Sequence, residues 1–153
     1  DMLIRSYEPA DCETLAELFR RSVHAVCAGD YTPKQLDAWA LGRVDLAAWN
    51  RSFLEHHTLV AVEGDIVVGF GDMDRTGYLD RLFVHPVFQR RGIATAICDS
   101  LENASAADRF TVHASITAKP FFEGRGYRTV KARTVLRNEV PLTNYLMEKA
   151  PIH

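Results

Sequence analysis

Leu79–Leu101, LDRLFVHPVFQRRGIATAICDSL, is the stretch that decides the fold. It begins with an apolar run, Leu82–Val84, which predicts a buried strand. The run ends at His85-Pro86, because the residue before a proline is pushed out of the α region. A basic turn with a glycine follows, and apolar residues then recur four apart, as on one face of a helix. The stretch therefore predicts a strand, a basic turn and a helix in direct succession.

This succession of elements suits the binding of a polyphosphate. The first N–H groups of a helix have no partner within the helix, and the helix dipole adds partial positive charge there. Gly92 and Ala94 have small side chains, so phosphate oxygens can approach the backbone, and Arg90 and Arg91 add charge. The predicted anion site spans the turn and the first helical residues: Gln89, Arg90, Arg91, Gly92, Ile93, Ala94 and Thr95.

The composition is that of an ordinary globular chain. Its 153 residues are 47% hydrophobic and 25% charged, and we expect one domain over residues 1–153. A net charge of −2 argues against a nucleic-acid partner, and no apolar run is long enough to predict a membrane span. The N-terminal residues do not resemble a signal peptide, and Cys12, Cys27 and Cys98 fit no metal spacing. We therefore expect a cytoplasmic protein with free thiols, no metal and no membrane association.

Periodicity along the chain predicts a mixed sheet. Helical spacing dominates the first third, with predicted N-caps at Asp11, Thr32 and Asp45. Gly64-Asp65 predicts a hairpin turn, and a short helix is expected over residues 115–123. Strands are expected over residues 3–7, 58–63, 66–73, 78–84, 110–114, 127–136 and 142–148. We expect a twisted mixed sheet with helices on both faces, containing one parallel, right-handed strand–helix–strand unit.

The loop resembles the phosphate-loop signature of the GNAT superfamily of acyl-CoA-dependent N-acetyltransferases, which is Gln or Arg, two residues, Gly, one residue, Gly or Ala. Gln89–Ala94, QRRGIA, fits this signature, and Val84–Pro86 fits the approach to it. Downstream, Ala118–Tyr127, AKPFFEGRGY, is similar to the family's A-x-x-F-Y-E-x-x-G-F helix. Within this superfamily, residues 111–131, TVHASITAKPFFEGRGYRTVK, together with residues 31–40, YTPKQLDAWA, look like the YafP-type bacterial acetyltransferases. A P-loop NTPase and a Rossmann site are disfavoured because neither GxxxxGK[ST] nor GxGxxG occurs.

The resemblance implies a fold and a reaction. The fold is α+β (mixed α/β), with a central twisted, mixed, mostly antiparallel sheet of about seven strands flanked by helices on both faces. The reaction is transfer of an acetyl group from acetyl-CoA, as co-substrate, to a primary amine by direct attack; the amine belongs to an unidentified small molecule, amino acid or peptide. The pantetheine arm is expected along Leu82, Phe83 and Val84, with an N–H near Phe83 or Val84 polarising the thioester carbonyl.

The resemblance also suggests catalytic residues. Asp80 lies where many family members place a glutamate that takes the amine's proton, although a salt-bridged Asp80 is an equally open alternative. Strand alternation predicts that Asp80 and Leu82 share a face. The family's usual proton donor, a tyrosine, is replaced by Phe122, and Tyr145 or Tyr31 is the candidate acid in its place. Two alternatives stay open: these tyrosines serve packing or the substrate wall, and the thiolate leaves with the help of water. His85 is a second candidate base.

Other residues are assigned to binding. Ser115 matches a position that bonds the pantetheine, or it caps a helix, and Phe122 is expected beside the cofactor. Lys119 and Arg125 are either phosphate contacts or solvated surface charges. The acceptor pocket is expected to include Tyr31, Trp39 and Asn144.

Two questions remain open on the sequence. The missing tyrosine at Phe122 keeps a second hypothesis alive, in which the chain is an acyl-CoA-binding sensor or interaction module with little or no turnover. Dimers are common in the superfamily, so a homodimer and a monomer are both open.

Overall fold

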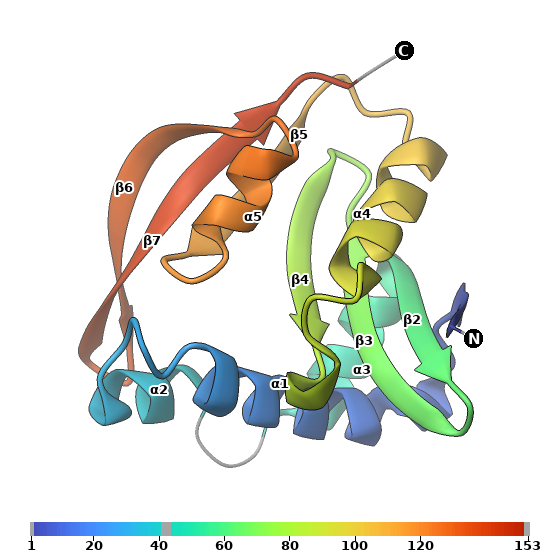
Figure 1. Cartoon of the computed structure of the whole chain (residues 1–153), viewed down its shortest axis with the longest axis horizontal. Helices are drawn as coiled ribbons and strands as arrows, with labels where there is room; N and C mark the ends of the chain where they lie inside the picture. Colours follow the sequence, from blue (N-terminus) through green and yellow to red (C-terminus); the bar gives the residue numbers. More distant parts are fainter. Residues whose placement is uncertain (1, 41–43, 152–153) are drawn as a thin grey trace.

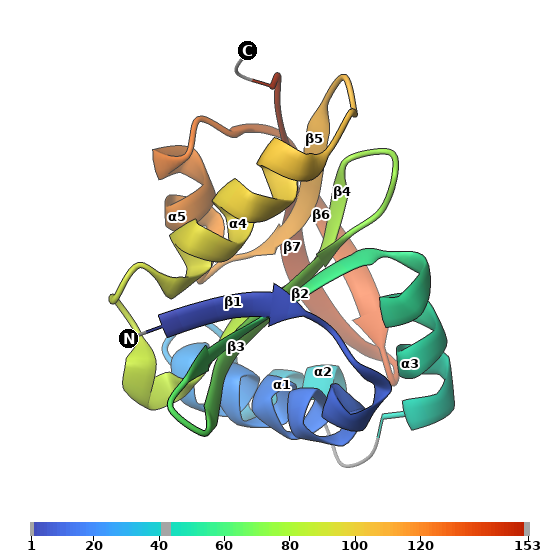
Figure 2. The same cartoon turned by 90° about the vertical axis from the view of Figure 1, so that its right-hand side faces the viewer.

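The computed structural model describes residues 2–40 and 44–151, and a twisted seven-stranded sheet forms its centre (Figures 1 and 2). The strands are β1 (Met2–Ser6), β2 (His57–Glu63), β3 (Ile66–Met73), β4 (Tyr78–Val84), β5 (Phe110–Ser115), β6 (Arg128–Arg137) and β7 (Val140–Lys149). Their order is β1-β2-β3-β4-β5-β7-β6, and every neighbouring pair is antiparallel except β4 and β5. The expected mixed, mostly antiparallel sheet is confirmed.

Helices cover both faces of this sheet. The helices are α1 (Cys12–Val26), α2 (Pro33–Ala40), α3 (Leu46–Glu55), α4 (Ile93–Ala104) and α5 (Lys119–Gly124), with 3-10 turns η1 (Pro9–Asp11) and η2 (Pro86–Phe88). Helices α1 to α3 lie on one side of the sheet, and α4 and α5 lie on the other (Figures 1 and 2). A cluster of buried side chains lies under each set of helices. Among the described residues, no helix is both long enough and apolar enough to span a bilayer.

The helix starts follow local hydrogen bonding, with one correction. Thr32 and Gln35 cap each other: Thr32 Oγ1 accepts from Gln35 N at 3.1 Å, and Gln35 Oε1 accepts from Thr32 N at 2.9 Å. Asp45 Oδ1 accepts from Ala48 N at 3.1 Å, as predicted. Asp11 does not cap α1, because its carboxylate binds the Arg5 guanidinium at 2.8 Å.

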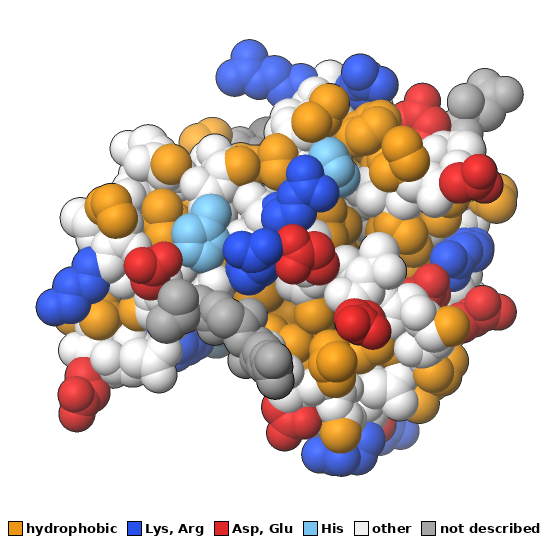
Figure 3. Space-filling view, turned by 90° about the horizontal axis from the view of Figure 1, so that it is seen from below, with side chains coloured by type: hydrophobic (Ala, Val, Ile, Leu, Met, Phe, Trp, Pro, Cys, Tyr) orange, Lys and Arg blue, Asp and Glu red, His pale blue; other side chains and the backbone are white. Residues whose placement is uncertain are grey.

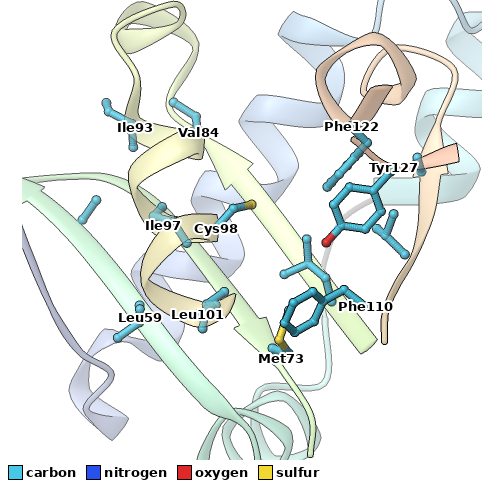
Figure 4. Packing of buried hydrophobic residues seen from close by; sticks show 14 of the residues in the cluster. Leu59, Met73, Val84, Ile93, Ile97, Cys98, Leu101, Phe110, Phe122 and Tyr127 are labelled. Atoms are coloured by element: carbon cyan, nitrogen blue, oxygen red, sulfur yellow. The ribbon is translucent and has the colours of Figure 1, made fainter. Parts of the chain in front are cut away.

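Helix α4 packs closely on the sheet (Figure 4). Ile97 and Leu101 project from α4 onto the strands, and both are almost completely buried. A Cβ at Gly69 or Gly71 would lie 2.9 Å from a methyl group of Ile93 or Ile97, respectively. The glycines therefore permit the close approach that brings the start of α4 to the end of β4.

Some boundaries differ from expectation. The short helix begins at Lys119 rather than at residue 115, because Ser115 Oγ accepts from Ala118 N at 3.0 Å and holds a turn before the helix. Strand β7 is longer than predicted, whereas β6 keeps its predicted length and begins one residue later, and the β6–β7 hairpin reaches toward α2 (Figure 1).

Candidate functional site

β4 and β5 pair over only two residues and then separate. The parallel register holds at Tyr78 with Thr111 and at Leu79 with Val112, and within the described part of the chain the rest of β4 has no strand partner on that side. The separation leaves a cleft of about 950 Å³ between the strands, bounded by α1, the turn before α4, α5 and β6. Leu82, Phe83 and Val84, predicted to line a cofactor arm, all border it.

Strand alternation identifies which β4 amides face the cleft. His85 N donates to Val68 O at 2.8 Å, so the residue two positions earlier, Phe83, also directs its N–H toward β3. The N–H groups of Leu82 and Val84 then face the cleft. Of the two predicted donors to a thioester carbonyl, Val84 is therefore the one whose N–H is available.

The turn before α4 presents backbone amides. Gly92 has φ 78°, Arg90 has φ 63°, and no side chain caps the N-terminus of this 12-residue helix. A Cβ at Gly92 would meet no atom within 4 Å, so the space over the helix start is open. Left-handed residues beside a helix start direct successive N–H groups into one concavity, which is a suitable environment for an anion.

The predicted loop residues lie in different surroundings, and only some of their side chains reach the cleft. Gln89, Arg90 and Ala94 line the cleft, and Gln89 Nε2 also donates to Val84 O at 2.8 Å, which closes the turn. Ile93 is buried in the core, so only its backbone can contact a ligand. The exposed Arg91 stacks on Phe88, and Thr95 borders a second hollow of about 810 Å³ between α4 and α5.

A β-bulge redirects Asp80. Asp72 pairs with Arg81 and Met73 pairs with Leu79, so Asp80 is an extra residue in β4 with no counterpart in β3. The expectation that Asp80 shares a face with Leu82 is wrong, because the bulge turns its carboxylate to the side of Arg81. Asp80 Oδ2 lies 3.4 Å from Arg81 Nη2.

A buried ion-pair network supports this bulge. Asp72 is completely buried, and its Oδ2 lies 2.6 Å from Arg81 Nη2 and 2.7 Å from His56 Nδ1. Burial, and then the negative charge of Asp72, raise the pKa of Asp80, while Arg81 and His56 partly oppose this rise. The hydrogen bond to Asp72 raises the pKa of His56. Asp80 is salt-bridged and also lines the cleft, so the salt-bridge alternative is confirmed and its role as base stays a prediction.

His56, Asp72 and Asp80 also bring three potential metal-ligand atoms within 4.8 Å of one another. Both oxygens of Asp72 accept hydrogen bonds from Arg81, however, at 3.0 and 2.6 Å. A guanidinium thus occupies the position that a cation would take, and the group is organised as an ion-pair network.

The candidate acids lie in different places. Phe122 borders the cleft with its ring packed against Phe121 and Tyr127. Tyr145 alternates with Asn144 on β7 and faces the opposite side of the sheet, where Lys119 Nζ lies 5.0 Å from its ring centroid. Tyr145 is not among the cleft residues, so the geometry gives its predicted role as acid no support.

The predicted acceptor residues, Tyr31, Trp39 and Asn144, all line the cleft, as does Ser115. The hydroxyl of Tyr31 is already used twice: it donates to Thr143 O at 2.7 Å and accepts from Ile116 N at 2.9 Å. Tyr31 therefore forms a wall by joining the early helices to the last strands. Ser115 caps the turn before α5, as one alternative predicted, and it borders the cleft, where its bond to the pantetheine stays a prediction.

The prediction of a solvated surface charge at Arg125 is wrong, and its alternative, a phosphate contact, stays a prediction. The Arg125 side chain is largely buried and binds Glu102 and Asp99 at 2.9 Å each, and Lys149 Nζ lies 2.6 Å from Glu102. This network joins α4, α5 and β7. Lys119 pairs with Glu123 at 3.7 Å on the surface of α5.

Sequence reasoning missed several polar residues of the cleft, among them Tyr78, His113, Arg133 and Arg137. Tyr78 Oη lies 3.0 Å from His113 Nδ1. The spacing of Arg133, Val135 and Arg137 was an available signal, since alternate residues of a strand share a face. Figure 3 shows the molecule from the side of α1 and α2, where cationic, anionic and histidine side chains lie close together near the middle of the face.

Comparisons with known proteins agree with this geometry. The acetyltransferase (GNAT) domain family matches residues 27–149. The uncharacterized N-acetyltransferase YafP of Escherichia coli is 37% identical over 150 residues, covering 98% of this chain and 97% of YafP. A GCN5-related N-acetyltransferase from Rhodopseudomonas palustris has a TM-score of 0.92 and 33% identity, over 97% of this chain and 94% of that one. The PaiA N-acetyltransferase from Thermoplasma acidophilum, solved with coenzyme A, has a TM-score of 0.81 and 18% identity, over 98% and 99%.

The chain therefore belongs to the GNAT family of acyl-CoA-dependent acetyltransferases. It is an acetyl-CoA-dependent N-acetyltransferase, which confirms the class and the co-substrate predicted from the loop and the FFEGRGY segment.

Proposed function

We propose that the protein acetylates a primary amine of a small molecule, amino acid or peptide by direct attack on acetyl-CoA. The observation that carries this proposal is the bulge in β4, which directs Asp80 into the same cleft that Leu82 and Val84 border with free N–H groups. A proton acceptor and oxyanion donors thus lie on one short strand segment. The start of α4 lies at the end of that segment and suits the CoA pyrophosphate.

Asp80 is the proposed base. An amine attacks only in its neutral form, so a group in the cleft must accept the ammonium proton. Burial beside Asp72 raises the pKa of Asp80, which makes its carboxylate a stronger base than an ordinary aspartate. Arg81 and His56 keep the carboxylate in place without neutralising it completely.

The acetyl group then moves in one addition and one elimination. The amine nitrogen forms a bond to the thioester carbon, and the carbonyl oxygen becomes an oxyanion that the N–H of Val84 stabilises. Collapse breaks the carbon–sulfur bond and releases the CoA thiolate, the nitrogen loses its second proton to water to give the acetamide, and the thiolate takes a proton from water to give free CoA. No side-chain acid is required in this scheme, which accommodates Phe122 at the usual tyrosine position.

The test measures free thiol release from acetyl-CoA with a panel of amines across pH, for the wild type and for Asp80→Asn. We expect turnover by the wild type that rises with pH as Asp80 loses its proton, and roughly 100-fold lower kcat without this rise in Asp80→Asn. Asp65→Asn, in the β2–β3 turn, is the matched control and should retain activity.

Two outcomes count against the proposal. An unchanged pH–rate profile in Asp80→Asn would remove Asp80 as the base. Thermal stabilisation by acetyl-CoA without thiol release from any amine would favour the alternative, an acyl-CoA-binding module.

A further inference from the structure

Two arginines of β6 form a cationic wall in the cleft. Arg133 and Arg137 are four residues apart on one strand, so they share a face, and both line the same cleft as Asp80. Within residues 2–40 and 44–151, no carboxylate lies within 4.0 Å of either guanidinium. Arg128, on the same strand, does pair with Glu148. The two cleft arginines are therefore positive charges without a balancing acid, and Arg133 is half-buried.

The cationic wall continues into the floor of the cleft. Arg133, Asn144 and Ser115 are directly opposite one another on β6, β7 and β5, so their side chains form a row on one face. Asn144 Oδ1 is buried without a hydrogen-bond partner among the described residues. Unsatisfied buried amides are uncommon and costly, and a polar group bound in the cleft would satisfy this one. Ser115 and Arg133 are separated by two strand spacings, about 10 Å.

The positive field of this wall reaches β5. Burial, and then the charges of Arg133, Arg137 and Lys131, lower the pKa of His113. His113 therefore stays neutral near pH 7 and adds no positive charge beside the two cleft arginines. The opposite wall carries the carboxylate of Asp80.

We propose that the acceptor amine also carries an anionic group, a carboxylate or a phosphate, that Arg133 and Arg137 bind while Asp80 receives the amine. This inference rests on the proposed function. Arginine presents a planar fork of donors that matches both anions, and two unpaired guanidiniums in one cleft favour such a group over a neutral one. Opposite charges on the two walls would orient a zwitterionic acceptor with its ammonium at the reacting carbon.

The test compares acceptors with and without the anionic group. Glycine, β-alanine, 4-aminobutyrate and 5-aminovalerate vary the separation of amine and carboxylate, each paired with its primary amide, and O-phosphoethanolamine is paired with ethanolamine. Calorimetric titration of the CoA complex measures binding, and thiol release from acetyl-CoA measures turnover. We expect at least one anionic member to exceed its neutral partner roughly 10- to 100-fold, the range for hydrogen bonds to charged groups.

Substitutions test whether Arg133 and Arg137 cause the preference for an anionic acceptor. Arg133→Gln and Arg137→Gln should reduce the ratio of anionic to neutral acceptor toward one, chiefly through KM, whereas Arg128→Gln removes the same charge outside the cleft and should keep the ratio. Equal binding of both members of every pair would overturn this inference, and so would an unchanged ratio of anionic to neutral acceptor in Arg133→Gln. Neither result would count against the proposed acetylation of an amine. Selective binding of an anionic member without any thiol release would support the anion site and count against the proposed function.

Discussion

Asp72 and Arg81 form a bidentate ion pair in the interior, with Arg81 Nε 3.0 Å from Asp72 Oδ1 and Nη2 2.6 Å from Oδ2. The two residues are directly opposite in the β3–β4 ladder, next to the bulge that carries Asp80. The guanidinium also lies over the rings of Trp49 and Phe53, at 4.9 and 4.3 Å. The pair thus fixes the strand segment that presents the proposed base to the cleft.

Arg81→Met should destabilise the protein strongly. It leaves the fully buried carboxylate of Asp72 without its main partner, and such losses cost about 3–5 kcal/mol. Urea denaturation followed by circular dichroism gives the free energy of unfolding. The double variant Asp72→Leu, Arg81→Met removes both charges and should be more stable than Arg81→Met alone. Arg128→Gln breaks an exposed ion pair and should cost less than about 1 kcal/mol. An equal loss of stability in Arg81→Met and Arg128→Gln would contradict this account.

His56 should make stability depend on pH. The bond to Asp72 raises the pKa of His56 in the folded state. The stabilisation is therefore complete below the unfolded pKa of about 6.5 and is lost as pH rises through the higher folded pKa. We expect Tm to fall over this range in the wild type, and to fall less in His56→Gln. His57→Gln, which removes an exposed imidazole from β2, is the control, and parallel Tm curves for wild type and His56→Gln would refute the assignment.

Features with local chemical signals could be predicted from the sequence. The cap at Thr32, the turn at Gly64-Asp65 and the glycine-containing start of α4 each depend on a few adjacent residues, and the structure has all three. The β2–β3 hairpin and the single parallel crossover from β4 to β5 also follow from local signals, whereas the position of β7 between β5 and β6 does not.

The details of the site depend on pairing between distant strands. The side on which Asp80 projects is set by a bulge against β3, and no residue of β4 alone encodes that register. Tyr145 was assigned from residue type, but strand alternation places it on the face opposite Asn144. His56 and Asp72 were missed because they are 16 residues apart and meet only when β3 packs beside the end of α3.

Phe122→Tyr should change kcat by less than about threefold, whereas a required general acid contributes roughly 100-fold or more. The ring of Phe122 borders the cleft, so a hydroxyl added to it can face the leaving thiolate. In the proposed scheme the thiolate departs without a protein acid, and a new donor adds little. Initial rates of thiol release at saturating substrates measure the effect, with Phe121→Tyr as the neighbouring control. A tenfold or larger rise specific to Phe122→Tyr would show that the missing acid limits turnover.

Gly92→Trp should weaken acetyl-CoA binding while leaving the fold intact. Gly92 has φ 78° and open space around it, so a side chain there would cover the free N–H groups of α4 without striking the core. Gly64 is the matched control, since it has φ 62° and is equally open but lies in the β2–β3 turn. Both tryptophan variants should lose about 1–2 kcal/mol of stability from left-handed strain, but only Gly92→Trp should raise the Kd for acetyl-CoA, by about tenfold or more, corresponding to about 1.4 kcal/mol. Equal affinity in the two variants, measured by calorimetry, would mean that the pyrophosphate binds away from the start of α4.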